Sequence, residues 1–251
     1  MIVKVHANAV ELGKAAAAHG AQIINDCIAR KGKARIVLST GASQFRLFES
    51  FASEKIDWSR VEAYHLDEYI GLPITHKASF RKYLKERFAD IYKPGYMRFV
   101  NTTVDIGQEL PELSADLLRQ PIDLGFIGIG ENAHIAFNDP PADFETKQPY
   151  IVVVLNDACK AQQVREGWFD TADDVPKTAV SMSVYGIMQC KAIISCVPGA
   201  VKAKAIFDTL ASSITPMIPA TKLKEHENVA VYLDKDSAGL LTPELLVAFS
   251  G

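Results

Sequence analysis

Short β-branched runs alternate with longer stretches of helical periodicity along nearly the whole chain, and this alternation constrains the fold more than any other feature. Such an order is typical of right-handed strand–helix–strand units, which place their strands in a parallel sheet with helices on both faces. No stretch rich in proline, glycine and serine separates two different compositions. We therefore expect an α/β fold, a Rossmann-like three-layer sandwich with a mainly parallel sheet, formed as one domain by residues 1–251.

Local patterns predict the individual elements. Strands are expected over residues 2–5, 35–38, 61–65, 97–100, 122–129, 150–155, 192–197 and 228–233. Helices are expected over residues 9–30, 44–53, 79–88, 108–119 and 202–211, with Asn8 as the N-cap of the first. The nearly continuous apolar runs 36–38, 151–155 and 193–197 predict strands that are buried on both faces.

Composition argues against several classes of protein. With 27 Lys and Arg residues against 30 Asp and Glu residues, the formal charge is −3, which gives no electrostatic reason to expect a nucleic-acid partner. No apolar run approaches the roughly 20 residues of a membrane span, and the N-terminus lacks the pattern of a secretory signal. Because the four cysteines are far apart and form no C-x-x-C pair, we expect buried, reduced thiols, no zinc site and a cytoplasmic protein.

The first segment with polar chemistry lies between the expected strand at 35–38 and the helix that follows. It consists of Ser39, Thr40, Gly41, Ala42 and Ser43. Small residues let backbone N–H groups approach an anion, and a helix N-terminus adds partial positive charge. The segment matches neither a Walker loop nor a dinucleotide fingerprint. It is therefore either a phosphate cradle or an ordinary strand-to-helix turn.

The second segment leaves the expected strand at 61–65. His65 and Asp67 are two positions apart, so their side chains point the same way on an extended chain. Asp67 and Glu68 place two carboxylates at the expected cleft, where burial or mutual repulsion can raise one pKa into the range of a general base. The alternative is a solvated acidic loop. A metal site at His65 and Asp67 would need at least one more ligand.

The third segment follows the expected strand at 122–129. Gly128 and Gly130 allow close backbone approach. His134, flanked by Asn132 and Asp139, can form an oriented acid/base imidazole, because a carboxylate partner fixes its tautomer. A lone histidine is more often structural. In open α/β sheets, however, ligands bind beyond the carboxyl ends of the strands, and all three segments are expected there.

Together and in this order, the three segments resemble the glucosamine-6-phosphate deaminase/isomerase family. That family has the patterns T-G-x-[ST], D-E-Y-x-G-L and G-x-G-x-[DN]-G-H-I-A-F-N-[ED]-P, which residues 40–43, 67–72 and 134–140 match in turn. Residues 198–203 are similar to the family segment that carries a phosphate-contacting lysine at a helix start. The similarity spans nearly the whole chain.

The resemblance implies cofactor-free conversion of an amino-sugar 6-phosphate, such as glucosamine 6-phosphate, to a ketose 6-phosphate and ammonia. Asp67 matches the general base, which moves a proton between C2 and C1 of the opened sugar. His134 matches the acid/base group of ring opening, with Asp139 in place of a supporting glutamate and Asn132 beside it. The residues that would hold the phosphate are Thr40, Gly41, Ala42, Ser43 and Lys202.

The chain departs from the family pattern around the histidine. Asn132 and Ala133 stand where the family often has aspartate and glycine; Asn132 carries no charge, so an imidazolium at His134 should be less stabilised. Ala133 cannot adopt a positive φ as cheaply as glycine. Gly167 occupies the place of an arginine, which leaves Arg165 as a candidate substrate contact. These departures predict either a different hexosamine phosphate or slower ring opening.

Two other functions stay open. A 6-phosphogluconolactonase-type hydrolase shares the expected fold, although residues 135–138 follow the deaminase form. A non-catalytic sugar-phosphate sensor would account for Asn132 and Ala133. We expect a small-molecule sugar phosphate as the partner, with no nucleic acid, membrane, cofactor or metal. Because members of the family differ in assembly, a homo-oligomer is one expected state.

Overall fold

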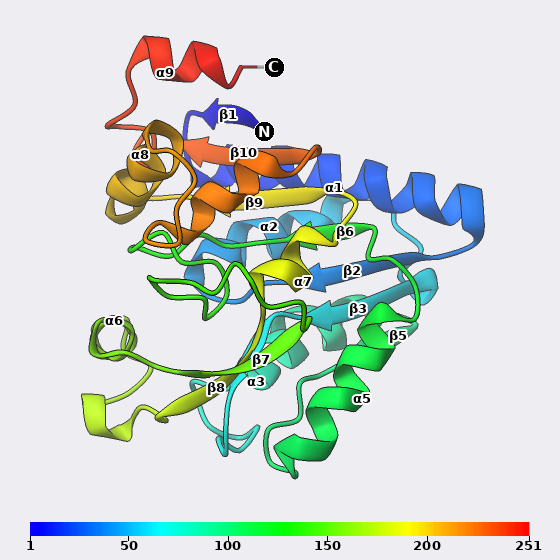
Figure 1. The fold of residues 1–251 in the computed structure, drawn as a ribbon. Helices are drawn as coiled ribbons and strands as arrows, with labels where there is room; N and C mark the ends of the chain where they lie inside the picture. The colour runs from blue at the N-terminus through cyan, green and yellow to red at the C-terminus, as the bar shows by residue number, and fades with distance from the viewer. Residues whose placement is uncertain (251) are drawn as a thin grey trace.

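The computed structural model describes residues 1–250 and contains a large parallel sheet at its centre (Figure 1). This sheet has seven strands in the order β1-β10-β9-β6-β2-β3-β5, and every pairing in it is parallel. Its strands are β1 (Ile2–His6), β2 (Ala34–Leu38), β3 (Val61–His65), β5 (Tyr96–Arg98), β6 (Leu124–Phe126), β9 (Ile193–Val197) and β10 (Val229–Asp234). The predicted α/β fold with a mainly parallel sheet is confirmed.

Helices cover both faces of this sheet (Figure 1). On one face, α1 (Ala9–Lys31) and α2 (Phe45–Ser50) pack against alternate residues of β2 such as Ile36 and Leu38. On the other face, α5 (Ile106–Leu118), α7 (Val184–Met188) and α8 (Ala203–Ala211) pack against residues such as Val37. The remaining helices are α3 (Phe80–Leu84), α4 (Asp90–Tyr92), α6 (Asp157–Arg165) and α9 (Pro243–Ala248). No helix within residues 1–250 is long and apolar enough to cross a membrane.

A second, smaller sheet lies beside the first and corrects one prediction. It is antiparallel, with the order β4 (Asp67–Tyr69), β8 (Thr178–Met182) and β7 (Tyr150–Val154). The prediction that residues 151–155 form a strand buried on both faces is wrong, because Val152 and Val154 are 47% and 80% exposed. A β-branched run favours an extended backbone, but it does not say which sheet the strand joins or what covers its faces.

The crossing of the chain from the large sheet to the small one determines the position of Asp67. β3 and β4 are separated only by Leu66, whose N–H donates to the carbonyl of Leu38 at 3.3 Å and whose carbonyl accepts from the N–H of Met182 at 2.6 Å. The chain therefore leaves the large sheet at Leu66 and enters the small one at once. Asp67, the first residue of β4, is placed at the carboxyl end of β3 by the bonds of Leu66 and by the pairing of β4 with β8.

Candidate active site

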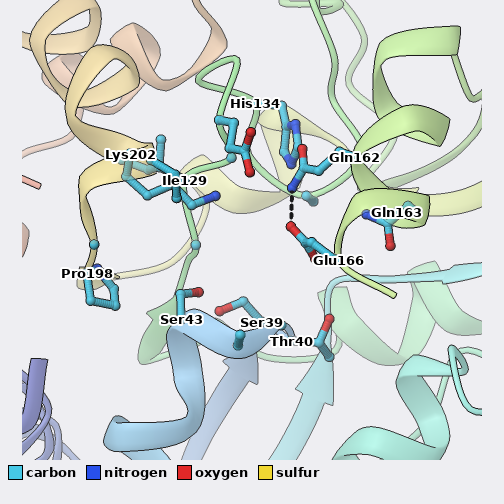
Figure 2. Close-up of a pocket in the computed structure, with 18 of the residues that line it drawn as sticks. Ser39, Thr40, Ser43, Ile129, His134, Gln162, Gln163, Glu166, Pro198 and Lys202 are labelled. Carbon is cyan, nitrogen blue, oxygen red and sulfur yellow. Dashed lines mark hydrogen bonds between the residues drawn. The ribbon is translucent and has the colours of Figure 1, made fainter. Parts of the chain in front are cut away.

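A cavity of about 710 Å³ lies at the carboxyl ends of β2, β3, β6 and β9 (Figure 2). The sequence-predicted residues that line it are Thr40, Gly41, Ala42, Ser43, Asp67, His134, Arg165 and Lys202. Asn132 and Asp139 are not part of the lining and contact His134 instead. The turn at residues 40–43 and Asp67 therefore face one cavity, as their places at strand ends predict.

The turn after β2 is shaped for an anion. Gly41 has φ +96°, a conformation that only glycine adopts at little cost, and a short 3₁₀ turn over Ala42–Gln44 follows it. The buried Gln44 donates from Nε2 to the hydroxyl oxygen of Ser43 at 2.9 Å. Because that oxygen already accepts a hydrogen bond, the hydrogen of the Ser43 hydroxyl is free to be donated to a ligand.

A similar turn follows β9 and also lines the cavity. Gly199 has φ +95°, its N–H donates to the carboxylate of Asp234 at 3.0 Å, and a 3₁₀ turn ends at Lys202. Figure 2 shows the Lys202 side chain extending toward the cavity. Burial lowers the pKa of its ammonium group, and nearby Arg165 adds to this effect, whereas Glu166 and Glu131 oppose it. An anionic ligand would replace the hydration that Lys202 has lost.

Asp67 is a poorly solvated carboxyl group on the cavity wall. Its residue is only 6% exposed, and burial, together with the neighbouring charge of Glu68, raises its pKa to about 8. Within residues 1–250, no hydrogen-bond donor reaches its carboxylate. The alternative of a solvated acidic loop is therefore wrong for this residue, and the environment suits a proton acceptor that works near neutral pH.

Glu68 does not share the cavity with Asp67, so the expected pair of cleft carboxylates is wrong. Successive residues of a strand point to opposite faces, and Glu68 points into the core. Its oxygens accept from the Ser79 hydroxyl at 2.7 Å, from the backbone N–H groups of Phe80 and Arg81, and from Nε of Arg81 at 3.2 Å. Glu68 thus holds the start of α3 and acts on Asp67 only through its charge.

His65 is a core residue and does not join a metal site. Its Nε2 accepts the backbone N–H of Val100 at 2.6 Å, which uses the lone pair that a metal would need. Burial, followed by the charges of Arg81 and Arg98, lowers its pKa to about 3, so the ring is neutral. No group of three or more His, Cys, Asp and Glu side chains within residues 1–250 is arranged to hold a metal ion.

The His134 ring is held from one side. Its Nδ1 lies 2.6 Å from Oδ1 of Asn132 and 3.1 Å from Oδ1 of Asp139, and Nδ2 of Asn132 donates to the same Asp139 oxygen at 3.0 Å. Burial opposes ionisation of Asp139, but the hydrogen bonds from His134 and Asn132 hold its pKa below the ordinary value. Asp139 thus supplies next to the imidazole the negative charge that Asn132 lacks, and Nε2 is left for a ligand.

The backbone around His134 accepts an unusual conformation. Ala133 has φ +64°, so the chain adopts the left-handed conformation here without glycine, although this conformation is unfavourable for a residue with a Cβ atom. Gly130 has a different role from the one expected. A Cβ atom at Gly130 would lie 2.2–2.5 Å from atoms of the His134 ring. The absence of a side chain at Gly130 therefore makes room for the imidazole of His134.

Helix α6 closes one side of the cavity and was missed in the sequence. Glu166, which follows the helix, accepts from Nε2 of Gln162 at 2.7 Å and from Nε1 of Trp168 at 3.1 Å. Arg165 pairs with Glu131 at 2.5 Å rather than pointing freely into the cavity. Asn156, whose side chain caps the helix at Cys159, was the available sequence signal. The helix is mostly polar, so apolar periodicity did not indicate it.

Comparison with known proteins gives a consistent result. The model of the family described as glucosamine-6-phosphate isomerases/6-phosphogluconolactonase matches residues 7–232. The chain belongs to this family. It is 35% identical to a glucosamine-6-phosphate deaminase of Clostridium botulinum over 238 residues, which cover 89% of this chain and 92% of that protein. A deaminase of Lactobacillus delbrueckii subsp. bulgaricus is 33% identical over 243 residues, 96% of this chain and all of the other.

Solved structures of the family have the same architecture. A monomeric glucosamine-6-phosphate deaminase superimposes with a TM-score of 0.86 at 28% identity, over 96% of this chain and 100% of that one. A 6-phosphogluconolactonase of Thermotoga maritima superimposes with a TM-score of 0.77 at 16% identity, over 93% and 99% of the two chains. At that identity the likeness to the lactonase concerns the fold alone. The resemblance inferred from the three sequence segments is confirmed.

Proposed function

We propose that this chain is a cofactor-free deaminase/isomerase that converts glucosamine 6-phosphate to fructose 6-phosphate and ammonia. The observation that carries the proposal is the placement of Asp67, a carboxyl group with a pKa of about 8, in the same cavity as the anion-binding turn at residues 40–43. Holding the remote phosphate positions the reacting carbons beside the base without entering the chemistry. The relatives named as deaminases support the same activity.

The proposed reaction uses the groups that the cavity presents. Nε2 of His134 exchanges the proton needed to open the sugar ring, while Nδ1 faces Asn132 and Asp139. The Asp67 carboxylate then takes the proton from C2 and returns it to C1, which leaves an imine at C2. Water adds to that carbon and ammonia departs, giving the ketose. We propose that Asn132 and Asp139 orient the imidazole and that Arg165 lies at the edge of the cavity without a role in the chemistry.

The deciding experiment is an assay of ammonia and ketose phosphate released from a panel of hexosamine 6-phosphates, with and without N-acetylation. Turnover of glucosamine 6-phosphate supports the proposal, and no turnover of any member by folded protein contradicts it. Lactone hydrolysis measured beside deamination tests the 6-phosphogluconolactonase alternative. Calorimetry that shows sugar-phosphate binding without turnover would favour the sensor.

The homo-oligomer expected from the sequence stays a prediction. The superimposable deaminase is described as monomeric, which gives the expectation no support. Sedimentation of the purified chain measures its assembly directly.

The rate should depend on pH through Asp67. Its ordinary pKa of 3.8 is raised to about 8 in the folded protein, and only the ionised form can accept the C2 proton. We therefore expect kcat/KM to increase as the pH rises from weakly acidic values through about 8. Initial rates over this range measure the profile. A profile that already reaches its plateau near pH 5 would contradict the proposed role of a buried base.

Lys202→Met should weaken binding of the phosphorylated sugar. Loss of one charged donor to a phosphate costs about 1.5–3 kcal/mol, so we expect KM to rise by about tenfold or more, with a smaller change in kcat. Lys204→Met is a matched control, because Lys204 follows on the same segment, is 77% exposed and pairs with Asp208. Steady-state kinetics of both variants measure the difference. Equal KM values in the two variants would remove Lys202 from the phosphate site.

A further inference from the structure

The hydroxyl of Ser39 makes no hydrogen bond to the described residues of the folded protein. Ser39 follows β2 directly and lines the cavity, although the residue is only 4% exposed. Its backbone N–H donates to the carbonyl of Phe126 at 2.9 Å, so its position is determined by the sheet. Its Oγ atom, however, is buried without a hydrogen-bond partner among the described residues. Such an unpaired buried hydroxyl is costly, and it therefore requires an explanation.

The surroundings of this hydroxyl indicate what would pair with it. Figure 2 shows the hydroxyl groups of Ser39 and Ser43 directed toward one another on the floor of the cavity. Gly128 lies beside them and carries no side chain; a Cβ atom there would lie 3.8 Å from Oγ of Ser39 and 3.6 Å from Nε2 of Gln44. Ser39, Ser43 and Gly128 all line the cavity, so a ligand bound there would lie beside the two serines. A phosphoryl group offers only acceptors, which suits two hydroxyl donors.

We propose that Ser39 is an additional binding residue, whose hydroxyl donates a hydrogen bond to a phosphoryl oxygen of the sugar phosphate. This inference rests on the proposed function, because it takes the turn after β2 as the phosphate site. Ser39 belongs to the candidate cradle segment, but the family resemblance implied phosphate contacts only from Thr40 onward, so its hydroxyl adds a donor to that set. The unpaired hydroxyl in the ligand-free protein is then a preformed donor, and the cost of burying it is offset when the anion binds.

The chain offers a matched control in Ser195. This residue lies on β9, is fully buried, and also carries a hydroxyl oxygen without a partner among residues 1–250. It does not belong to the cavity lining. Ser39→Ala and Ser195→Ala therefore remove the same chemical group from two buried sites, and only one of these faces the cavity.

The test is calorimetric titration of inorganic phosphate and of glucosamine 6-phosphate into the wild-type chain and both variants. For Ser39→Ala we expect about tenfold weaker binding of both ligands, as for the loss of one donor to a charged group. For Ser195→Ala we expect unchanged binding. Thermal unfolding of both variants should show no loss of stability, because removing an unpaired buried hydroxyl removes only a desolvation penalty.

The outcomes separate this inference from the proposed function. Wild-type affinity of Ser39→Ala for phosphate, or an equal loss in Ser195→Ala, overturns the inference. A loss confined to glucosamine 6-phosphate overturns it too, because the hydroxyl would then contact the sugar. If wild-type protein binds phosphate in a Ser39-dependent way but releases no ammonia from any hexosamine phosphate, the inference stands and the proposed function fails. A wild-type chain that binds neither ligand overturns both.

Discussion

Asp67→Asn is expected to lower kcat by about a thousandfold or more, because a neutral amide cannot accept the C2 proton and a general base contributes about 10²–10⁴ in rate. Affinity for the sugar phosphate should be largely unchanged, since the substitution preserves shape and Asp67 is held by backbone hydrogen bonds of its strand. Single-turnover kinetics and calorimetric titration measure the two quantities separately. Equal losses of binding and rate would contradict the role of Asp67 as the base.

The same variant has a distinct stability signature. In the folded protein the pKa of Asp67 is about 8, against 3.8 for the ordinary group, so between these values the folded state holds a proton that the unfolded state has released. Wild-type stability must therefore decrease as the pH rises through this range. Asp67→Asn does not titrate, so its free energy of unfolding should exceed that of the wild type by a margin that grows toward pH 8. Denaturant unfolding at several pH values measures the margin.

Glu68→Gln, one position further along, is expected to keep the base in place, with a lower Asp67 pKa because one of the charges that raises it is removed, and to destabilise the fold. The fully buried Glu68 carboxylate balances Arg81, whose side chain is only 6% exposed, and accepts backbone N–H groups at the start of α3. Removing one partner of a buried pair leaves an uncompensated charge and costs about 3–5 kcal/mol. An amide keeps part of the hydrogen bonding, so we expect a loss of about 3 kcal/mol in the free energy of unfolding.

A second variant keeps this prediction testable if Glu68→Gln folds poorly. Adding Arg81→Met should recover part of the lost stability, because neither buried partner then carries a charge. Urea unfolding of the single and double variants gives the coupling between the two residues. Near wild-type stability of Glu68→Gln combined with a large loss of turnover would show that Glu68, rather than Asp67 alone, faces the reacting sugar.

Local signals in the sequence were sufficient for the overall fold and for most of the candidate cavity. Asn8 caps α1 through its side chain, and Gly41 makes the turn after β2, because caps and positive-φ turns depend on a few adjacent residues. The alternation of strands and helices predicts the parallel sheet. Since parallel strands end at one edge, the polar segments that follow them meet in one cavity.

Only the tertiary structure decided which of these side chains face the cavity. Apart from the family resemblance, residue types could not separate Asp67 from Glu68, because the chain changes sheets at Leu66 and the second sheet determines which neighbour points inward. Strand pairing is non-local, so the apolar run of β7 did not reveal its exposed, antiparallel sheet, and the polar helix α6 did not reveal that it closes the cavity. The sequence also gives no sign that the hydroxyl of Ser39 is unpaired. Its unpaired hydroxyl becomes visible only once the surrounding strands have removed it from water.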